Sequence, residues 1–174
     1  MKQHITAIAP MRAQPFHFGH QRFVSQLSHE FHKVLILLNR DPGFDDPFSF
    51  KIRKKWILSH CLFRGLSNVS VPERLECEQK HEYRILGGED FLIITTNETD
   101  KHYSDLGFRT LNHHINPLPS PPKREEFPGW CQSRICDTGQ TIRTKLRAND
   151  SCEGLVSKEI ELEALVLINK FEHT

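Results

Sequence analysis

Residues 4–38, HITAIAPMRAQPFHFGHQRFVSQLSHEFHKVLILL, contain the pattern of a strand, a turn, a helix and a second strand. The β-rich alternation of His4–Ala9 predicts the first strand, and the apolar run of Lys33–Leu38 predicts a strand buried on both faces. Between them, His20–His32 carries apolar residues at spacings of three and four, which is typical of an amphipathic helix. A strand, a helix and a further strand in this order form the unit from which parallel sheets are built.

The rest of the chain continues the alternation. The sequence predicts further helices and strands, the helices over Ser49–Phe63, Glu98–Leu106, Thr141–Ala148 and Ser157–Phe171, and the strands over Asn68–Val71, Phe91–Thr96 and Phe108–Leu111. The proline-dense stretch 117–128 indicates a surface loop, because too little chain follows it to form a second core. We therefore predict one α/β domain over residues 1–174, with a mainly parallel five-stranded sheet flanked by helices and a C-terminal helix.

Composition narrows the classes of partner. The chain has 174 residues, with 23 Lys and Arg against 22 Asp and Glu, so it has neither a polybasic arm nor an acidic tail and we expect no nucleic-acid partner. The longest apolar run, Val34–Leu38, is far shorter than the roughly 20 residues of a membrane span, and the N-terminal residues lack the features of a signal peptide. Five cysteines without a C-x-x-C pair predict no disulfide framework and indicate scattered buried thiols, with a zinc site on Cys131, Cys136 and a histidine as the alternative. We expect a cytoplasmic protein.

The turn between the first strand and the first helix is the first candidate site, because ligands of such sheets bind at the carboxyl ends of strands. His17 and His20 flank Gly19 just where the helix is expected to begin. A helix start has unpaired N–H groups that attract phosphate, and neutral imidazoles can donate to phosphate oxygens at little desolvation cost. No carboxylate or serine stands beside them for a triad, so the pattern favours phosphoryl or nucleotidyl transfer. The structural alternative is that one histidine caps the helix and the other faces solvent.

Two further groups of residues could contact phosphates. Thr138-Gly139 before the expected late helix would offer a hydroxyl and free N–H groups, and Arg143 would add a bidentate donor, unless it is simply an exposed helix arginine. Arg53, in the second expected helix, could reach the phosphate of an acceptor substrate.

Several motifs in sequence order resemble those of one family. Residues 12–20, RAQPFHFGH, are similar to the G-R-F-Q-P-F-H-x-G-H segment of the archaeal-type nicotinamide-nucleotide adenylyltransferases, within the HxGH nucleotidyltransferase superfamily. The resemblance continues through four later stretches of the chain. Residues 46–53 are similar to the family motif N-P-F-T-x-x-E-R, and residues 95–97 and 106–108 to S-N-N and A-G-Y. Residues 124–127 are similar to R-E-E-Y, and residues 138–143 to S-G-T-x-I-R. It spans nearly the whole chain.

The resemblance implies a Rossmann-like fold and the transfer of AMP from ATP, with Mg²⁺ on the triphosphate, to a small phosphate monoester such as nicotinamide mononucleotide. It implies that His17, His20 and Arg143 act at the reacting phosphates and that Gly19 allows the adenine to approach the backbone. The remaining ATP contacts would come from both motifs, namely Arg12, Gln14, Phe16, Thr138, Gly139, Gln140 and Thr141. A homo-oligomer is also implied.

The sequence departs from the family pattern in three places. Gln140 stands where the family has threonine, and residues 128–137 form an insertion whose Trp130 could stack on a base or nicotinamide ring or serve as a packing anchor. Residues 71–86 lack the tryptophan with which the family reads nicotinamide. Two alternatives therefore stay open: a cytidylyl- or phosphopantetheine-type transferase of the same superfamily, and a non-catalytic nucleotide-binding regulator.

Overall fold

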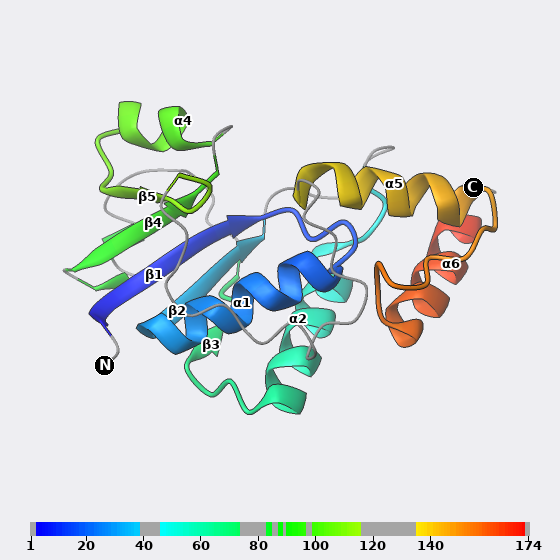
Figure 1. The fold of residues 1–174 in the computed structure, drawn as a ribbon, viewed down its shortest axis with the longest axis horizontal. Coiled ribbons are helices and arrows are strands. Elements are labelled where there is room, and N and C mark those ends of the chain that lie inside the picture. Colours follow the sequence, from blue (N-terminus) through cyan, green and yellow to red (C-terminus); the bar gives the residue numbers. More distant parts are fainter. Residues whose placement is uncertain are drawn as a thin grey trace. The chain divides into compact units, whose positions relative to one another are not determined.

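The computed structural model describes residues 3–38, 46–73, 83–84, 87–88, 90–96, 99–115 and 135–172. Its centre is a five-stranded sheet in the order β3-β2-β1-β4-β5, whose four neighbouring pairs of strands all run parallel (Figure 1). The strands are β1 (Gln3–Met11), β2 (Phe31–Leu38), β3 (Val69–Ser70), β4 (Phe91–Thr95) and β5 (Thr110–Asn112). The predicted α/β class with a five-stranded parallel sheet is confirmed.

The strand order reverses at β1, since β2 and β3 lie on one side of it and β4 and β5 on the other. In sheets of this kind the loop that follows the central strand is where ligands bind. Residues directly after Met11 are therefore placed by topology as well as by sequence to carry the chemistry.

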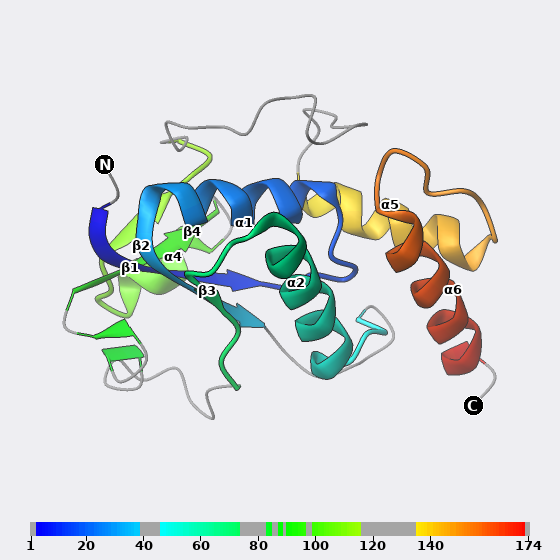
Figure 2. The ribbon, with the colours of Figure 1, turned by 90° about the horizontal axis from the view of Figure 1, so that it is seen from below.

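The helices are α1 (Phe18–Glu30), α2 (Phe50–Arg64), α4 (Asp100–Asp105), α5 (Ile135–Arg147) and α6 (Lys158–Glu172). Helix α4 is followed by a glycine in the left-handed region, Gly107 with φ of 76°, which is a common helix end. Helices α5 and α6 contact each other and lie side by side in both views (Figures 1 and 2). No helix among the described residues is long and apolar enough to cross a membrane.

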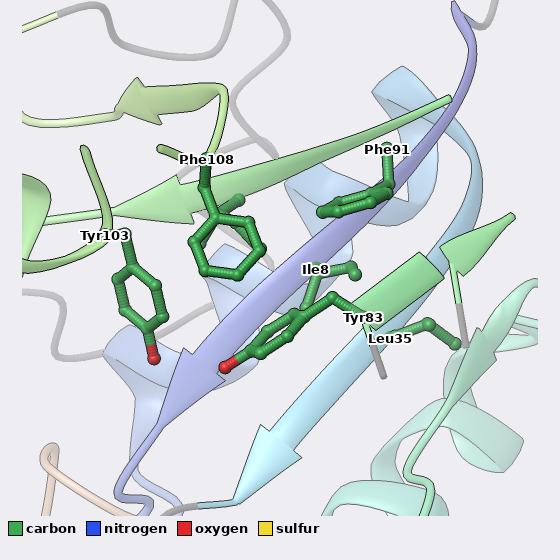
Figure 3. Packing of buried hydrophobic residues seen from close by; sticks show 7 residues of the cluster. Ile8, Leu35, Tyr83, Phe91, Tyr103 and Phe108 are labelled. Atoms are coloured by element: carbon green, nitrogen blue, oxygen red, sulfur yellow. The ribbon is translucent and has the colours of Figure 1, made fainter. Parts of the chain in front are cut away.

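Contacts divide the chain into two compact units. The first comprises Met1–Met11, Val24–Asn39 and Cys61–Pro121 and holds the sheet. Its core gathers aromatic rings and aliphatic side chains over the strands, among them Ile8, Leu35, Tyr83, Phe91 and Phe108 (Figure 3). The Tyr83 and Phe108 rings lie 4.8 Å apart, a spacing typical of packed aromatic pairs. This packing supports the strand from which the candidate site follows.

The second unit comprises Arg12–Phe23, Arg40–His60 and Pro122–Thr174. It contains the turn after β1, the start of α1, most of α2, and both C-terminal helices. The described residues that are predicted to bind phosphate all lie in this unit.

Most element boundaries lie one or two residues from their predicted positions, and the start of α5 differs by more. Helix α1 ends at Glu30, because Phe31 and His32 begin β2 rather than ending the helix. Helix α5 begins at Ile135, six residues before the predicted start at Thr141. This second difference changes the interpretation of the late phosphate motif.

Candidate active site

His17 caps the N-terminus of α1. Its carbonyl accepts the first intrahelical bond from the Gln21 amide at 3.0 Å, and its ring Nδ1 accepts from the Gly19 amide at 3.1 Å. The Phe18 amide donates to the Leu155 carbonyl at 3.1 Å. The expectation that free amides at this helix start attract phosphate therefore needs correction: the amides of Phe18 and Gly19 are already bonded within the chain.

The cap also sets the tautomer of His17. A ring nitrogen that accepts from a backbone amide carries no proton, so in the neutral imidazole the proton sits on Nε2. The side chain is fully buried, with 0% exposure. His17 thus offers one hydrogen-bond donor whose direction is fixed by the helix it caps.

His20 lies against His17, with ring centroids 3.8 Å apart and planes 28° from parallel. Burial lowers the pKa of His20 well below its ordinary value, and the neighbouring His17 lowers it further, against the opposing effect of the Pro15 carbonyl. Its Nδ1 is buried and has no hydrogen-bond partner among the described residues. His20 is therefore a neutral imidazole at pH 7 and does not face solvent as a charged side chain.

Phe16 packs against the histidine pair. Its ring stacks on His20 at 6.0 Å between centroids and meets His60 edge-on at 5.6 Å, and its side chain is fully buried. Phe16 thus packs against the histidine, and its predicted contact with a cofactor stays a prediction.

Gln14 is held by a reciprocal pair of bonds to the main chain of Phe48. Its amide nitrogen donates to the Phe48 carbonyl at 2.9 Å, and its amide oxygen accepts from the Phe48 N–H at 3.0 Å. The side chain is only 2% exposed. Gln14, predicted to bind the cofactor, is instead occupied in holding the segment before α2 against the turn.

Arg53 is not placed to bind a substrate. Its side chain is 0% exposed, and its Nη1 donates to the Arg12 carbonyl at 2.8 Å. The predicted contact with an acceptor phosphate is therefore corrected, because the guanidinium lies inside the protein and bonds to the backbone of the turn.

Arg143 reaches the same turn from α5. Its Nη1 donates to the Gln14 carbonyl, and the residue is 8% exposed. The alternative of an exposed helix arginine is thus wrong. Between the two carbonyls held by Arg53 and Arg143 lies Ala13, whose φ of 50° is in the left-handed region.

Gly139 lies within α5 and not ahead of it. Since the helix starts at Ile135, the Gly139 amide lies past the first turn, and the predicted phosphate cradle at Thr138-Gly139 is not a helix start. A Cβ on Gly139 would lie 3.3 Å from the Gln14 carbonyl oxygen and 3.4 Å from Arg143 Nη1. The glycine permits a close approach between helix and turn, which explains why it occurs inside a helix.

The remaining predicted residues have varied surroundings. Arg12 is exposed and pairs with Asp46, its Nε lying 3.2 Å from the carboxylate. Gln140 and Thr141 are exposed on α5, whereas Gly19 is half-buried at the start of α1. Trp130 and the side chain of Thr138 lie outside the described part of the structure.

Sequence reasoning missed the role of Glu163 on α6. Its carboxylate accepts from Lys55 Nζ at 2.7 Å and from Trp56 Nε1 at 2.8 Å, and Trp56 in turn packs edge-on against Phe48 at 5.1 Å. The last helix therefore supports the residue to which Gln14 bonds. A glutamate on an amphipathic helix gives no signal of such a contact in sequence.

The arrangement presents hydrogen-bond donors rather than acids, bases or metal ligands. Two neutral histidines and a nearby guanidinium can orient an anion and stabilise negative charge that develops on it. Among the residues that the structure describes, no three His, Cys, Asp or Glu side chains gather to hold a metal ion. The site suits reactions in which positioning and charge stabilisation supply most of the rate.

Comparisons with known proteins place the fold. No family model matches the chain, and no curated protein matches it in sequence. Among solved structures, a proposed nicotinate-nucleotide adenylyltransferase from Vibrio parahaemolyticus matches with a TM-score of 0.62 and 16% identity, over 95% of this chain and 99% of that one.

Two structures of a bifunctional NMN adenylyltransferase/ADP ribose pyrophosphatase from Francisella tularensis match over 99% of this chain, with TM-scores of 0.58 and 0.57 and identities of 18% and 19%. The second of these contains AMP and a manganese ion. This chain spans 51% and 50% of those longer chains. The predicted Rossmann-like fold is thus confirmed: the chain shares the fold of these solved structures.

Proposed function

We propose that the chain is an adenylyltransferase that transfers AMP from ATP to a nicotinamide-type mononucleotide, with release of pyrophosphate. The observation that carries the proposal is the pair of stacked, neutral histidines at the start of α1, directly after the central strand. The fold shared with nicotinate- and nicotinamide-nucleotide adenylyltransferase structures supports it.

In the proposed reaction an oxygen of the acceptor's phosphate forms a bond to the α-phosphorus of ATP. The bond from that phosphorus to the bridging oxygen breaks, and pyrophosphate leaves with the electron pair. The attacking phosphate is already ionised, so the site needs no strong general base. This agrees with the neutral state of His20.

The residues of the turn would stabilise charge on the transferring group. His17 would donate from Nε2, since its Nδ1 is occupied by the Gly19 amide. His20 would donate as a neutral imidazole, and Arg12 would contact the outer phosphates from its exposed position. Arg143 has one guanidinium nitrogen on the Gln14 carbonyl and would direct another to the leaving pyrophosphate.

Among the described residues no three His, Cys, Asp or Glu side chains gather to hold a metal ion, and the carboxylate of Asp46 is paired with Arg12. We propose that Mg²⁺ arrives bound to the triphosphate and keeps its water ligands. The protein's own part in the reaction is then confined to positioning and hydrogen bonding.

The test is pyrophosphate release from ATP and Mg²⁺ with separate acceptors: nicotinamide mononucleotide, its deamidated form and phosphopantetheine. We expect release with a nicotinamide-type nucleotide, and a loss of about 10²- to 10³-fold in kcat for His20→Ala with ATP binding largely kept. His32→Ala, which removes an exposed histidine of β2, is the matched control and should leave kcat unchanged. Release with none of the acceptors, or full activity of His20→Ala, would contradict the proposal.

A further inference from the structure

We propose that Arg53 is a positioning residue that, together with Arg143, clamps the main chain around Ala13. The clamp fixes the turn from which His17 and His20 are presented. The catalytic part of this inference rests on the proposed function, whereas its structural part does not.

Ala13 has a left-handed backbone conformation, which residues other than glycine avoid. Its φ is 50°, and its side chain is fully buried in the turn. Such a residue persists only where its surroundings hold it, because the left-handed region brings Cβ too close to the following carbonyl. The sequence has not placed a glycine there, so other groups must supply the restraint.

Those groups are two guanidinium donors on the carbonyls that flank Ala13. Arg53 Nη1 donates to the Arg12 carbonyl at 2.8 Å, and Arg143 Nη1 donates to the Gln14 carbonyl. The two arginines come from different helices, α2 and α5, so they hold the turn from independent supports. The amide of Gln14, bonded to both backbone groups of Phe48, adds a third fixed point.

Arginine rather than lysine suits this task. A guanidinium is planar and presents its donors in a rigid fork, and the Arg53 Nε also faces the Ser49 carbonyl at 3.4 Å. Lysine would keep the charge but would lose the fixed direction. Arg53→Lys therefore separates the geometry of the clamp from its charge.

The turn transmits its position directly to the histidines. His17 follows Gln14 by three residues, and its Nδ1 must meet the Gly19 amide for the cap to form. Small displacements of catalytic groups can cost as much as about 100-fold in rate. A loosened clamp is thus expected to lower kcat more than it weakens ATP binding.

The experiment compares Arg53→Lys, Ala13→Gly and the double variant, with Lys51→Gln on the exposed face of α2 as the control for lost charge. We expect Arg53→Lys to lower kcat about tenfold or more, with the KM for ATP changed less than about twofold. Ala13→Gly should restore at least about threefold of kcat in the Arg53→Lys background, since glycine adopts this φ without strain. The ¹⁵N shift of His17 Nδ1 should move toward that of an unbonded imidazole in Arg53→Lys and return in the double variant.

An unchanged kcat and His17 shift in Arg53→Lys would overturn the proposal, and so would a loss that Ala13→Gly does not relieve. If the wild-type chain shows no transferase activity, the proposed function fails, but the His17 shift still decides about the clamp. If Arg53→Lys does not fold, hydrogen exchange of the Arg53 guanidinium N–H groups in the wild-type protein tests the clamp instead. Slow exchange at Arg53 supports the clamp, and exchange as fast as at the exposed Arg109 refutes it.

Discussion

Replacing Gln14 by glutamate should make the stability of the protein depend on pH in a defined direction. The amide nitrogen of Gln14 donates to the Phe48 carbonyl at 2.9 Å, and its oxygen accepts from the Phe48 N–H at 3.0 Å. A glutamate can reproduce both bonds only when it is protonated, because an ionised carboxylate has no donor. The buried site therefore raises the pKa of the introduced carboxyl.

The size of the effect follows from the cost of keeping that proton. Holding a carboxyl of ordinary pKa, about 4.3, in its protonated form costs about 3.7 kcal/mol at pH 7 and about 1 kcal/mol at pH 5. The folded variant either keeps the carboxyl protonated or loses the hydrogen bond, whichever costs less free energy. The destabilisation at pH 7 is therefore at most about 3.7 kcal/mol. Because the folded pKa is raised, the stabilising bond is fully present below about pH 4.3 and is lost as the pH rises through the folded pKa.

Urea unfolding of Gln14→Glu and wild type between pH 5 and pH 7 measures this difference. The stability gap should widen by up to about 1.4 kcal/mol per pH unit. Gln140→Glu introduces the same carboxyl at an exposed position of α5 and should show no such widening. A gap that stays constant with pH, or a Gln14→Glu protein as stable as wild type at pH 7, would refute the reciprocal bond to Phe48.

Two further predictions concern the same unit. Gly139→Ala should lower kcat/KM about tenfold, because the added methyl group would lie 3.3 Å from the Gln14 carbonyl oxygen. Alanine also favours the helix by about 1 kcal/mol over glycine, which offsets the strain, so the melting temperature should stay near that of wild type. Thr144→Ala, exposed on the same helix, is the control, and an active Gly139→Ala enzyme would contradict the close approach. Burial lowers the pKa of His20, so the unfolded chain takes up the proton first, and stability should be complete above about pH 6.5 and fall by up to about 1.4 kcal/mol per pH unit below it. Unfolding curves of wild type and His20→Gln between pH 5 and pH 7.5 check this, and parallel losses in the two proteins would show that His20 is not the group responsible.

The sheet could be predicted because its central strands β1, β2 and β4 are largely buried. Runs such as Phe91–Thr95, in which every residue is buried, leave a continuous apolar pattern that a helix of this length would not show. The HxGH turn could also be found, because the motif falls between a predicted strand and a predicted helix. Topology then fixed its place after the central strand.

The supporting contacts of the turn could not be predicted, because they join residues far apart in sequence. The sequence predicts that Arg53 reaches the phosphate of an acceptor, and only the three-dimensional structure shows it buried against the Arg12 carbonyl. The Thr138-Gly139 pair is predicted to precede a helix that begins at Thr141, but Gly139 lies inside α5 and packs closely against Gln14. In both places a contact with the distant turn, and not the local sequence, determines where the residue lies.

The bond from Arg143 to the Gln14 carbonyl spans 129 residues and has a consequence for synthesis of the protein. On the ribosome, the histidine motif and all five strands emerge well before α5. A nascent chain ending before Ile135 would contain His17 and His20 but would lack the donor that closes the turn from the C-terminal side. The order of translation thus delays closure of the turn that carries both histidines until α5 has been made.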